Sequence, residues 1–167
     1  DPRTGAITRY AMPDSTVRDP HTLVFDARGD IWFTAQNSGA VGHLETRTGK
    51  IRLAFTGANT RPYGIVLNSK GVPWFNLFGT DKIATIDPAS MAVRTYTLPN
   101  ERARGRRIAV TSDDIVWYGD SNNPRCIRWD PALGAGGFSY GVGAASRGRG
   151  ITVGFDAAVW ETMVSAR

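Results

Sequence analysis

The chain is built from short runs in which β-branched and aromatic residues alternate with polar ones. In the first repeat these runs are Thr22–Asp26, Asp30–Ala35, Ala40–Glu45 and Lys50–Thr56. Runs of this length and composition predict β-strands, and the glycine-containing polar stretches between them are typical of hairpin turns. No window shows the 3.6-residue period of an amphipathic helix. The pattern therefore predicts an all-β fold of antiparallel strands.

The same pattern recurs along the chain in one phase. Tryptophans spaced 42, 43 and 43 residues apart mark it, at Trp32, Trp74, Trp117 and Trp160. Eleven residues before each tryptophan a strand begins, at His21, Tyr63, Arg106 and Arg149. An acidic residue recurs in the same phase, at Glu45, Asp87 and Asp130. Four strands in each repeat of about 42 residues predict a β-propeller blade, whereas a β-sandwich would not require these residues to repeat in phase.

The repeats predict one partial β-propeller that fills residues 1–167. Full blades are expected near residues 14–56, 57–98 and 99–141, with half-blades at 1–13 and 142–167. Asp1–Ile7 aligns with Glu45–Ile51, so the residues before Pro13 are expected to supply one outer strand. The last half-blade is expected to supply two strands. We therefore expect the chain to be a segment of a longer propeller, whose remaining blades would be its partners.

The amino-acid composition indicates a globular protein but does not indicate a function. Apolar residues make up 41% and charged residues 21% of the chain, which is ordinary for a globular protein. The sequence contains no run of 18 apolar residues, which is about the length needed to span a membrane. The cellular compartment stays open, either cytoplasmic or exported. The single cysteine, Cys126, excludes an intrachain disulfide. It occupies the position of Val41 and Ile83, so we expect it to be a small buried hydrophobic residue.

The repeated segments resemble the blades of the virginiamycin B lyase (streptogramin lyase) family. Blades of that family read P-H/Y-G-I, then W-F-T-E, then K-I-G-R-I-D-P, then I-T-E-Y-x-L-P. The matching segments are Pro20–Leu23, Arg61–Ile65, Trp32–Thr34, Lys82–Pro88, Ile7–Pro13 and Val93–Pro99. The resemblance covers residues 1 to about 131 well and the rest loosely. It implies a ring of seven blades, of which this chain holds about four.

The resemblance also implies an activity and a site. The family's enzyme linearises a cyclic depsipeptide antibiotic by elimination: a histidine removes a proton alpha to a carbonyl, Mg²⁺ stabilises the enolate, and the ester carboxylate leaves. The segment Asp19-Pro20-His21 is similar to the family motif E-P-H, which implies that His21 is the catalytic base and Asp19 a metal ligand. The second metal ligand falls where this sequence has Gln36, a neutral oxygen donor. The family's second active-site histidine lies in an adjacent blade, where this chain offers either Tyr63 or no equivalent residue.

Arginine supplies most of the charge: 20 lysines and arginines, mostly arginines, outweigh 15 acids to give a net charge of +5. Many arginines lie near the connections between blades, which emerge on one face of a propeller, here called the loop face. They are Arg18, Arg61, Arg102, Arg104, Arg106, Arg107, Arg147 and Arg149. Concentrated positive charge attracts anions, although solvated loop arginines without a ligand are the somewhat favoured alternative. Nucleic acid is less favoured as a partner, because exposed aromatic residues do not alternate with the arginines.

Two hypotheses from different classes therefore stand. One is the family's carbon–oxygen lyase, with catalytic His21 and with Asp19 and Gln36 holding Mg²⁺. The other is a non-catalytic propeller that binds an anionic or small-molecule ligand, or a protein partner, on the loop face. Its ligand-binding residues would be Tyr63, Arg61, Arg106 and Arg149. Two further expectations concern single positions: His43 on a solvated strand face, and the four in-phase tryptophans in the core.

Overall fold

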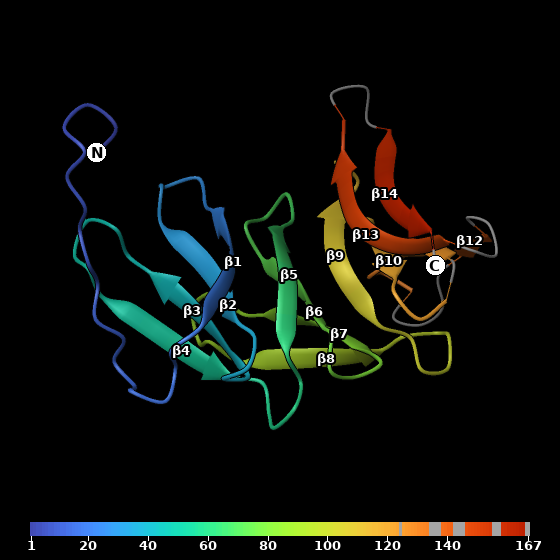
Figure 1. The fold of residues 1–167 in the computed structure, drawn as a ribbon, viewed down its shortest axis with the longest axis horizontal. Coiled ribbons are helices and arrows are strands. Elements are labelled where there is room, and N and C mark those ends of the chain that lie inside the picture. Colours follow the sequence, from blue (N-terminus) through green and yellow to red (C-terminus); the bar gives the residue numbers. More distant parts are fainter. Residues whose placement is uncertain (124, 134–137, 142–145, 155–157, 166–167) are drawn as a thin grey trace.

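The computed structural model describes residues 1–123, 125–133, 138–141, 146–154 and 158–165. Their regular structure consists of strands, which form four antiparallel sheets (Figure 1). The first sheet contains β1 (Pro20–Phe25), β2 (Ile31–Ala35), β3 (Ala40–Leu44) and β4 (Ile51–Phe55), and the second β5 (Pro62–Leu67), β6 (Pro73–Leu77), β7 (Lys82–Ile86) and β8 (Val93–Thr97). The third contains β9 (Gly105–Val110), β10 (Val116–Asp120), β11 (Arg125–Trp129) and β12 (Phe138–Gly141), and the fourth is the hairpin β13 (Ser146–Val153) and β14 (Val159–Ser165).

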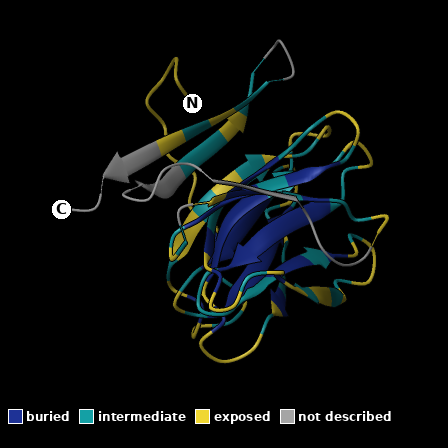
Figure 2. Cartoon of the chain, turned by 90° about the vertical axis from the view of Figure 1, so that its right-hand side faces the viewer, coloured by how far each residue is buried: buried dark blue, intermediate teal, exposed yellow. Residues whose placement is uncertain are grey.

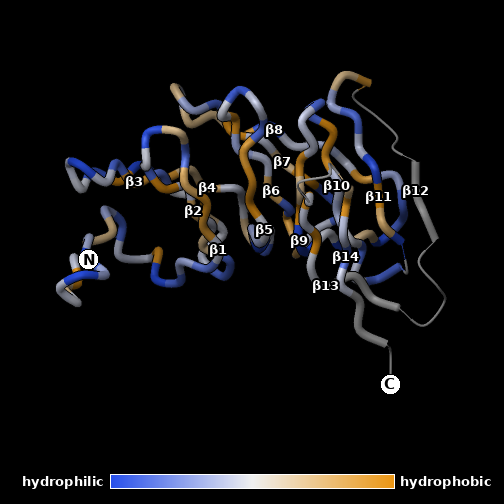
Figure 3. Tube along the Cα trace, turned by 90° about the horizontal axis from the view of Figure 1, so that it is seen from above, coloured by the Kyte–Doolittle hydropathy of each residue, from blue (hydrophilic) through white to orange (hydrophobic). Residues whose placement is uncertain are grey.

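The sheets follow one another around an arc, as successive blades of a propeller do. Seen from above, the first strands of the sheets (β1, β5, β9 and β13) lie side by side along one edge, and the later strands extend away from it (Figure 3). Each four-stranded sheet keeps its strands in chain order. The predicted partial β-propeller of four-stranded antiparallel blades is confirmed. No helix in the described chain is long and apolar enough to cross a membrane.

Each sheet packs on the next through a tryptophan at the same repeat position. Trp32, 2% exposed, contacts a buried cluster of the second sheet that includes Phe75, and Trp74, 5% exposed, packs likewise on the third sheet. Trp117 is half-buried and Trp160 is 60% exposed. The expectation of four core tryptophans is therefore wrong for Trp160, because no described sheet covers its side of the β13–β14 hairpin. Figure 2 shows the buried residues gathered within the stacked sheets.

The first strands of neighbouring blades approach each other backbone to backbone. A Cβ atom on Gly64, in β5, would lie only 2.8 Å from the carbonyl oxygen of Arg106, in β9. Such a close approach of two backbones is a position that glycine permits and larger residues do not. The side chain of Tyr63, next to Gly64, is consequently brought up to the start of β9.

Residues 1–12 form no strand. The outer strand expected before Pro13 is absent, because no described strand lies beside these residues to share hydrogen bonds with them. Side chains hold the segment instead. The Tyr10 hydroxyl donates to the carbonyl oxygen of Thr46 at 3.4 Å, and Met12 packs against the buried cluster that contains Val17.

His43 is buried, with 1% of its side chain exposed, so the expectation of a solvated position is wrong. Its ring packs on Trp32 with 4.4 Å between the ring centroids. Arg52 of β4 and Asp26 of the turn after β1 lie beside it. The expectation came from repeat alignment with polar residues in other blades. Alignment could not show that turn side chains cover this particular position.

Candidate functional site

The candidate site lies where the first strands β1, β5 and β9 begin. The turn between β2 and β3 and the turn between β6 and β7 reach the same end of the sheets, since strands in an antiparallel sheet alternate in direction. Loops at one end of a rigid scaffold are where propellers and similar folds usually carry function. The residues that converge here come from three different blades. They are His21, Tyr63, Phe78, Arg104, Arg106 and Arg107, here called the aromatic–arginine cluster.

Tyr63 is the centre of this cluster. Its ring is buried, and its hydroxyl accepts a hydrogen bond from Arg106 Nη2 at 2.9 Å. The Arg106 and Arg107 guanidinium carbons lie 5.0 and 5.1 Å from the centre of the Tyr63 ring, within the range of cation–π attraction. The Tyr63 carbonyl accepts from the Thr34 hydroxyl at 2.8 Å, which ties β5 to the first blade. The tyrosine is therefore held rigidly between two arginines.

His21 lies exposed beside that tyrosine. The two rings are 4.3 Å apart between centroids and tilted by 54°. His21 Nδ1 is 2.8 Å from the Thr22 hydroxyl, which also accepts a hydrogen bond from Arg107 Nη1 at 3.1 Å. Burial of part of the ring and the charge of Arg107 lower the pKa of His21, although Asp19 opposes them. The imidazole is thus neutral near pH 7.

Phe78, in the turn after β6, extends the aromatic surface. Its ring centre lies 5.4 Å from that of Tyr63. The guanidinium carbons of Arg104 and Arg106 lie 5.7 and 5.9 Å from the centre of the Phe78 ring. Nothing in the sequence marked Phe78, because it follows its strand in a turn and matches no repeated motif. Arg104 and Arg107 were part of the predicted charged set, but their contact with aromatic rings was not foreseen.

Asp19 belongs to a turn and not to the cluster. Its carboxylate accepts hydrogen bonds from the backbone N–H of Asn37, the backbone N–H of Ser38 at 3.1 Å, and the Ser38 hydroxyl. Partial burial alone would raise the pKa of Asp19, but these hydrogen bonds outweigh that effect and lower it. The carboxylate is therefore ionised and serves to hold the β2–β3 turn against the chain before β1.

The implied magnesium ligands do not fit that ion. Mg²⁺ requires near-octahedral oxygen coordination. A carboxylate has about four lone-pair positions, and three donors already occupy Asp19. Gln36 starts the same turn and brings no negative charge. In the described part of the chain, Asp19 is in no group of three or more His, Cys, Asp or Glu ligand atoms close enough to share an ion. The charge of Arg107 beside His21 adds like-charge repulsion.

The other two predicted ligand-binding residues are placed differently. Arg61 is exposed and has a left-handed backbone with φ of 51°. Its carbonyl accepts from the Phe78 N–H at 3.0 Å, so it supports the turn that carries Phe78. The backbone of Arg149 lies in β13, and its side chain is outside the described residues. The structure thus brings His21, Tyr63 and Arg106 together.

The cluster has the chemistry of an anion site. An arginine guanidinium is always charged and presents a planar fork of donors that matches a carboxylate or phosphate. Here three guanidinium groups surround two aromatic rings and one neutral imidazole. In the described residues, none of these three arginines is within ion-pair distance of a carboxylate. Their positive charge is therefore available to a ligand.

Known proteins match this chain through their structures. No protein-family model matches the sequence, and no curated protein matches it. A solved structure of catalytically inactive virginiamycin B lyase from Staphylococcus aureus with quinupristin superposes with a TM-score of 0.86 and 27% identity, covering 97% of this chain and 54% of that one. The selenomethionine-substituted enzyme from the same organism has a TM-score of 0.84 and 27% identity, covering 96% of this chain and 54% of that one. A streptogramin B lyase structure, at a TM-score of 0.80 and 20% identity over 99% of this chain and 61% of that one, shares the fold.

These structures confirm the resemblance that the blade motifs predicted. The chain has the propeller fold of the virginiamycin B lyases, and it spans just over half the length of the solved structures it matches.

Proposed function

We propose that this chain is a virginiamycin B lyase-like propeller that binds an anionic ligand at the aromatic–arginine cluster. The observation that carries the proposal is the hydrogen bond from Arg106 to the Tyr63 hydroxyl. It holds a charged guanidinium in place without neutralising it. A carboxylate or phosphate group of the ligand would accept from Arg106 and Arg107, and an apolar part of the ligand would lie on Phe78.

Charge supports this assignment over magnesium binding. Three arginines without acidic partners create a positive field, which raises the local concentration of anions and opposes a divalent cation. Because the cluster is partly open to solvent, the attraction should weaken as salt is added. Asp19, the acidic residue whose charge acts on His21, is occupied by its turn.

A lyase that acts on a depsipeptide ester is the second candidate, and one observation favours it. His21 is a neutral imidazole at an exposed position, as a general base near pH 7 must be. In a β-elimination of this kind, such a base takes the proton from the carbon next to the one that bears the ester oxygen, the C–H electrons form a C=C double bond, the C–O bond breaks, and the carboxylate departs with the C–O electron pair. If this chain has that function, the rate of ring opening depends on His21. Asp19 and Gln36 would then not contribute as metal ligands.

Calorimetry and product analysis separate the two candidates. We expect citrate and inorganic phosphate to bind the protein at low salt and to bind more weakly at high salt. Arg106→Gln and Arg107→Gln should each lower the affinity about tenfold, whereas Arg94→Gln, on an exposed outer strand, should not change it. Equal affinity in all three variants would contradict the proposal. Incubation with quinupristin, with and without magnesium, tests the second candidate: a ring-opened product that His21→Ala abolishes would establish the lyase.

A further inference from the structure

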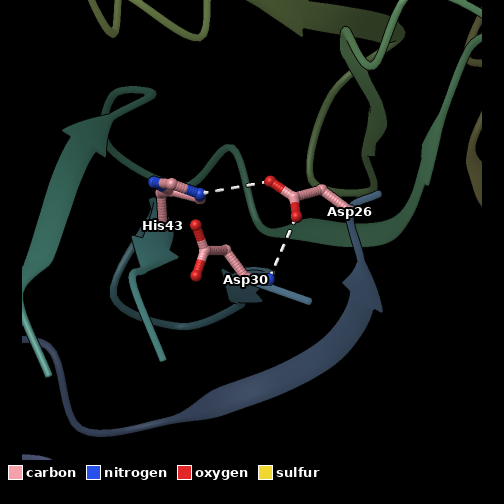
Figure 4. A group of neighbouring side chains, drawn as sticks. All are labelled: Asp26, Asp30 and His43. Carbon is pink, nitrogen blue, oxygen red and sulfur yellow. Dashed lines mark hydrogen bonds and ion pairs between the residues drawn. The ribbon is translucent and has the colours of Figure 1, made fainter. Parts of the chain in front are cut away.

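A second polar centre lies at the other end of β1 from the aromatic–arginine cluster. Asp26 and Asp30 flank the turn between β1 and β2, and His43 projects toward them from β3 (Figure 4). Asp30 and His43 border a hollow of about 700 Å³ whose lining also includes Glu45 and Arg52, and Asp26 borders a smaller hollow of about 240 Å³. Neither the predicted lyase site nor the proposed anion site uses any of them.

His43 presents a buried nitrogen that lacks a partner. Its side chain is 1% exposed, and Nε2 makes no hydrogen bond. The nearest acidic atom, Asp26 Oδ2, is 3.7 Å away, which is too long for a hydrogen bond. Arg52 Nη2 lies 3.2 Å from Nδ1, and because a guanidinium only donates, Nδ1 is the acceptor and the ring is neutral. A neutral ring forms no ion pair with Asp26, and a buried nitrogen without a partner is costly.

Each carboxylate is anchored by one oxygen and offers the other. Asp26 Oδ1 accepts from the backbone N–H of Arg28 at 2.8 Å and of Asp30 at 3.0 Å, whereas Oδ2 points toward His43. Asp30 Oδ1 accepts from the Thr46 N–H at 2.9 Å. Asp26 Oδ2 accepts a long hydrogen bond from Nη2 of the exposed Arg28 at 3.5 Å, and Asp30 Oδ2 lies 3.8 Å from Arg28 Nε. The turn therefore fixes both carboxylates while leaving an oxygen of each to bind something else.

We propose that Asp26, Asp30 and His43 bind a divalent transition-metal ion such as Zn²⁺. Their ligand atoms lie within 4.8 Å of one another. Two ligands about 2.0 to 2.1 Å from a tetrahedral zinc lie about 3.3 Å apart, so the 3.7 Å gap between Nε2 and Oδ2 needs to close only slightly. One imidazole and two carboxylates form a donor set that suits zinc or cobalt better than magnesium. Water from the hollow would complete the coordination.

Arg52 opposes this binding and gives the proposal a specific signature. Its Nη2 lies 3.2 Å from His43 Nδ1, and it also donates to the carbonyl oxygen of Pro88 at 2.9 Å. Because a guanidinium only donates, Nδ1 must be the acceptor, and the single proton of the neutral ring lies on Nε2. Metal binding requires the lone pair of Nε2. The Nε2 proton then passes to solvent, Nδ1 takes one up, and Arg52 leaves Nδ1 while keeping its carbonyl contacts.

Cobalt titration of the whole chain tests the site. We expect Co²⁺ to bind with one equivalent and to give the visible absorption of a four- or five-coordinate ion, and Zn²⁺ to displace it. Asp30→Asn keeps the acceptor for Thr46 but loses the ligand charge, and should weaken binding at least about tenfold, as should His43→Gln. Asp113→Asn, at an exposed turn elsewhere, is the matched control and should leave binding unchanged.

Arg52→Gln distinguishes this site from a structural ion pair. Removing the guanidinium frees Nδ1 to carry the proton, so Co²⁺ affinity should rise about fivefold or more. If Asp30→Asn and Asp113→Asn bind Co²⁺ equally, or if no variant and no wild-type protein shows the cobalt spectrum, the proposal is wrong. Circular dichroism of each variant establishes that it is folded, and because Asp30→Asn preserves the turn hydrogen bond, the test does not depend on the His43 variant.

Discussion

Tyr63 of the second blade and Arg106 of the third are joined across the boundary between blades. The Arg106 guanidinium donates to the tyrosine hydroxyl at 2.9 Å and lies 5.0 Å from the centre of the ring. Gly64 makes this contact possible by letting β5 approach β9. The same tyrosine contacts His21 of the first blade. One residue thus connects three blades and positions the charge that we assign to ligand binding.

Removing the Tyr63 hydroxyl should weaken anion binding without unfolding the protein. In Tyr63→Phe the ring remains, but Arg106 loses the hydrogen bond that positions it. We expect citrate affinity to fall about fivefold, which corresponds to about 1 kcal/mol, the typical net value of one hydrogen bond. Calorimetry at low salt measures it. Tyr96→Phe, on an outer strand, is the control, and an equal loss in both variants would show that Tyr63 has no special role.

The pKa of His21 should lie below its usual value of 6.5 and should respond to Arg107. Burial and the Arg107 charge lower this pKa, so Arg107→Gln should raise it while Asp19→Asn should lower it further. Titration of the imidazole signals by NMR measures both shifts. The protein has two histidines, and the spectrum of His21→Gln assigns them. A pKa that does not move in Arg107→Gln would contradict the arrangement of charges described above.

Glu161 should destabilise the fold at neutral pH. Among the described residues neither of its buried carboxylate oxygens has a full hydrogen bond, and burial raises its pKa above 4.5, although the Cys126 thiol beside it opposes this effect. Between 4.5 and the folded pKa the folded state binds more protons than the unfolded state, so this residue's contribution to stability falls as pH rises. Glu161→Gln should therefore raise the free energy of unfolding by about 1 kcal/mol at neutral pH and change it little at about pH 4. Urea denaturation at both values tests the sign, with exposed Glu101→Gln as the control.

Equivalent tryptophans should differ sharply in their contribution to stability. Trp74 is 5% exposed and packs on the third blade, so Trp74→Ala should cost about 3 to 5 kcal/mol. Trp160 occupies the same repeat position but is 60% exposed, so Trp160→Ala should cost less than about 1 kcal/mol. Chemical denaturation of the two variants measures the difference. Similar losses would mean that Trp160 is covered in solution.

Asp19 should matter for folding and not for magnesium. Asp19→Asn removes the charge that accepts from Asn37 and Ser38, and we expect a loss of about 1.5 to 3 kcal/mol in unfolding free energy. The wild-type advantage should be present above pH 3.8 and disappear as pH falls through the lowered pKa of the folded state. Calorimetry should detect no tight Mg²⁺ binding by either protein. Tight binding by the wild type that Asp19→Asn abolishes would restore the role that the family resemblance implies.

The strands of this protein could be predicted because their determinants are local. Alternation of apolar and polar residues and the turns around Gly29 and Gly49 are properties of neighbouring residues, and the 42- to 43-residue spacing repeats them. These features were enough to predict blades of four antiparallel strands. The start of a strand at His21 and at Tyr63 also follows from the spacing, which is why both residues were candidates before the structure.

What the tertiary structure decided is which side chains meet between blades and turns. Phe78 reaches Tyr63 because the β6–β7 turn lies level with the start of β5, and Asp19 is occupied because the β2–β3 turn folds back onto it. His43 is buried by residues of two turns and a neighbouring strand, although its equivalents in other blades are only half-buried. Repeat alignment reports the position of a residue within its own blade. Contacts across blades depend on packing between segments distant in sequence, so the sequence alone determined the blades and the packing determined the site.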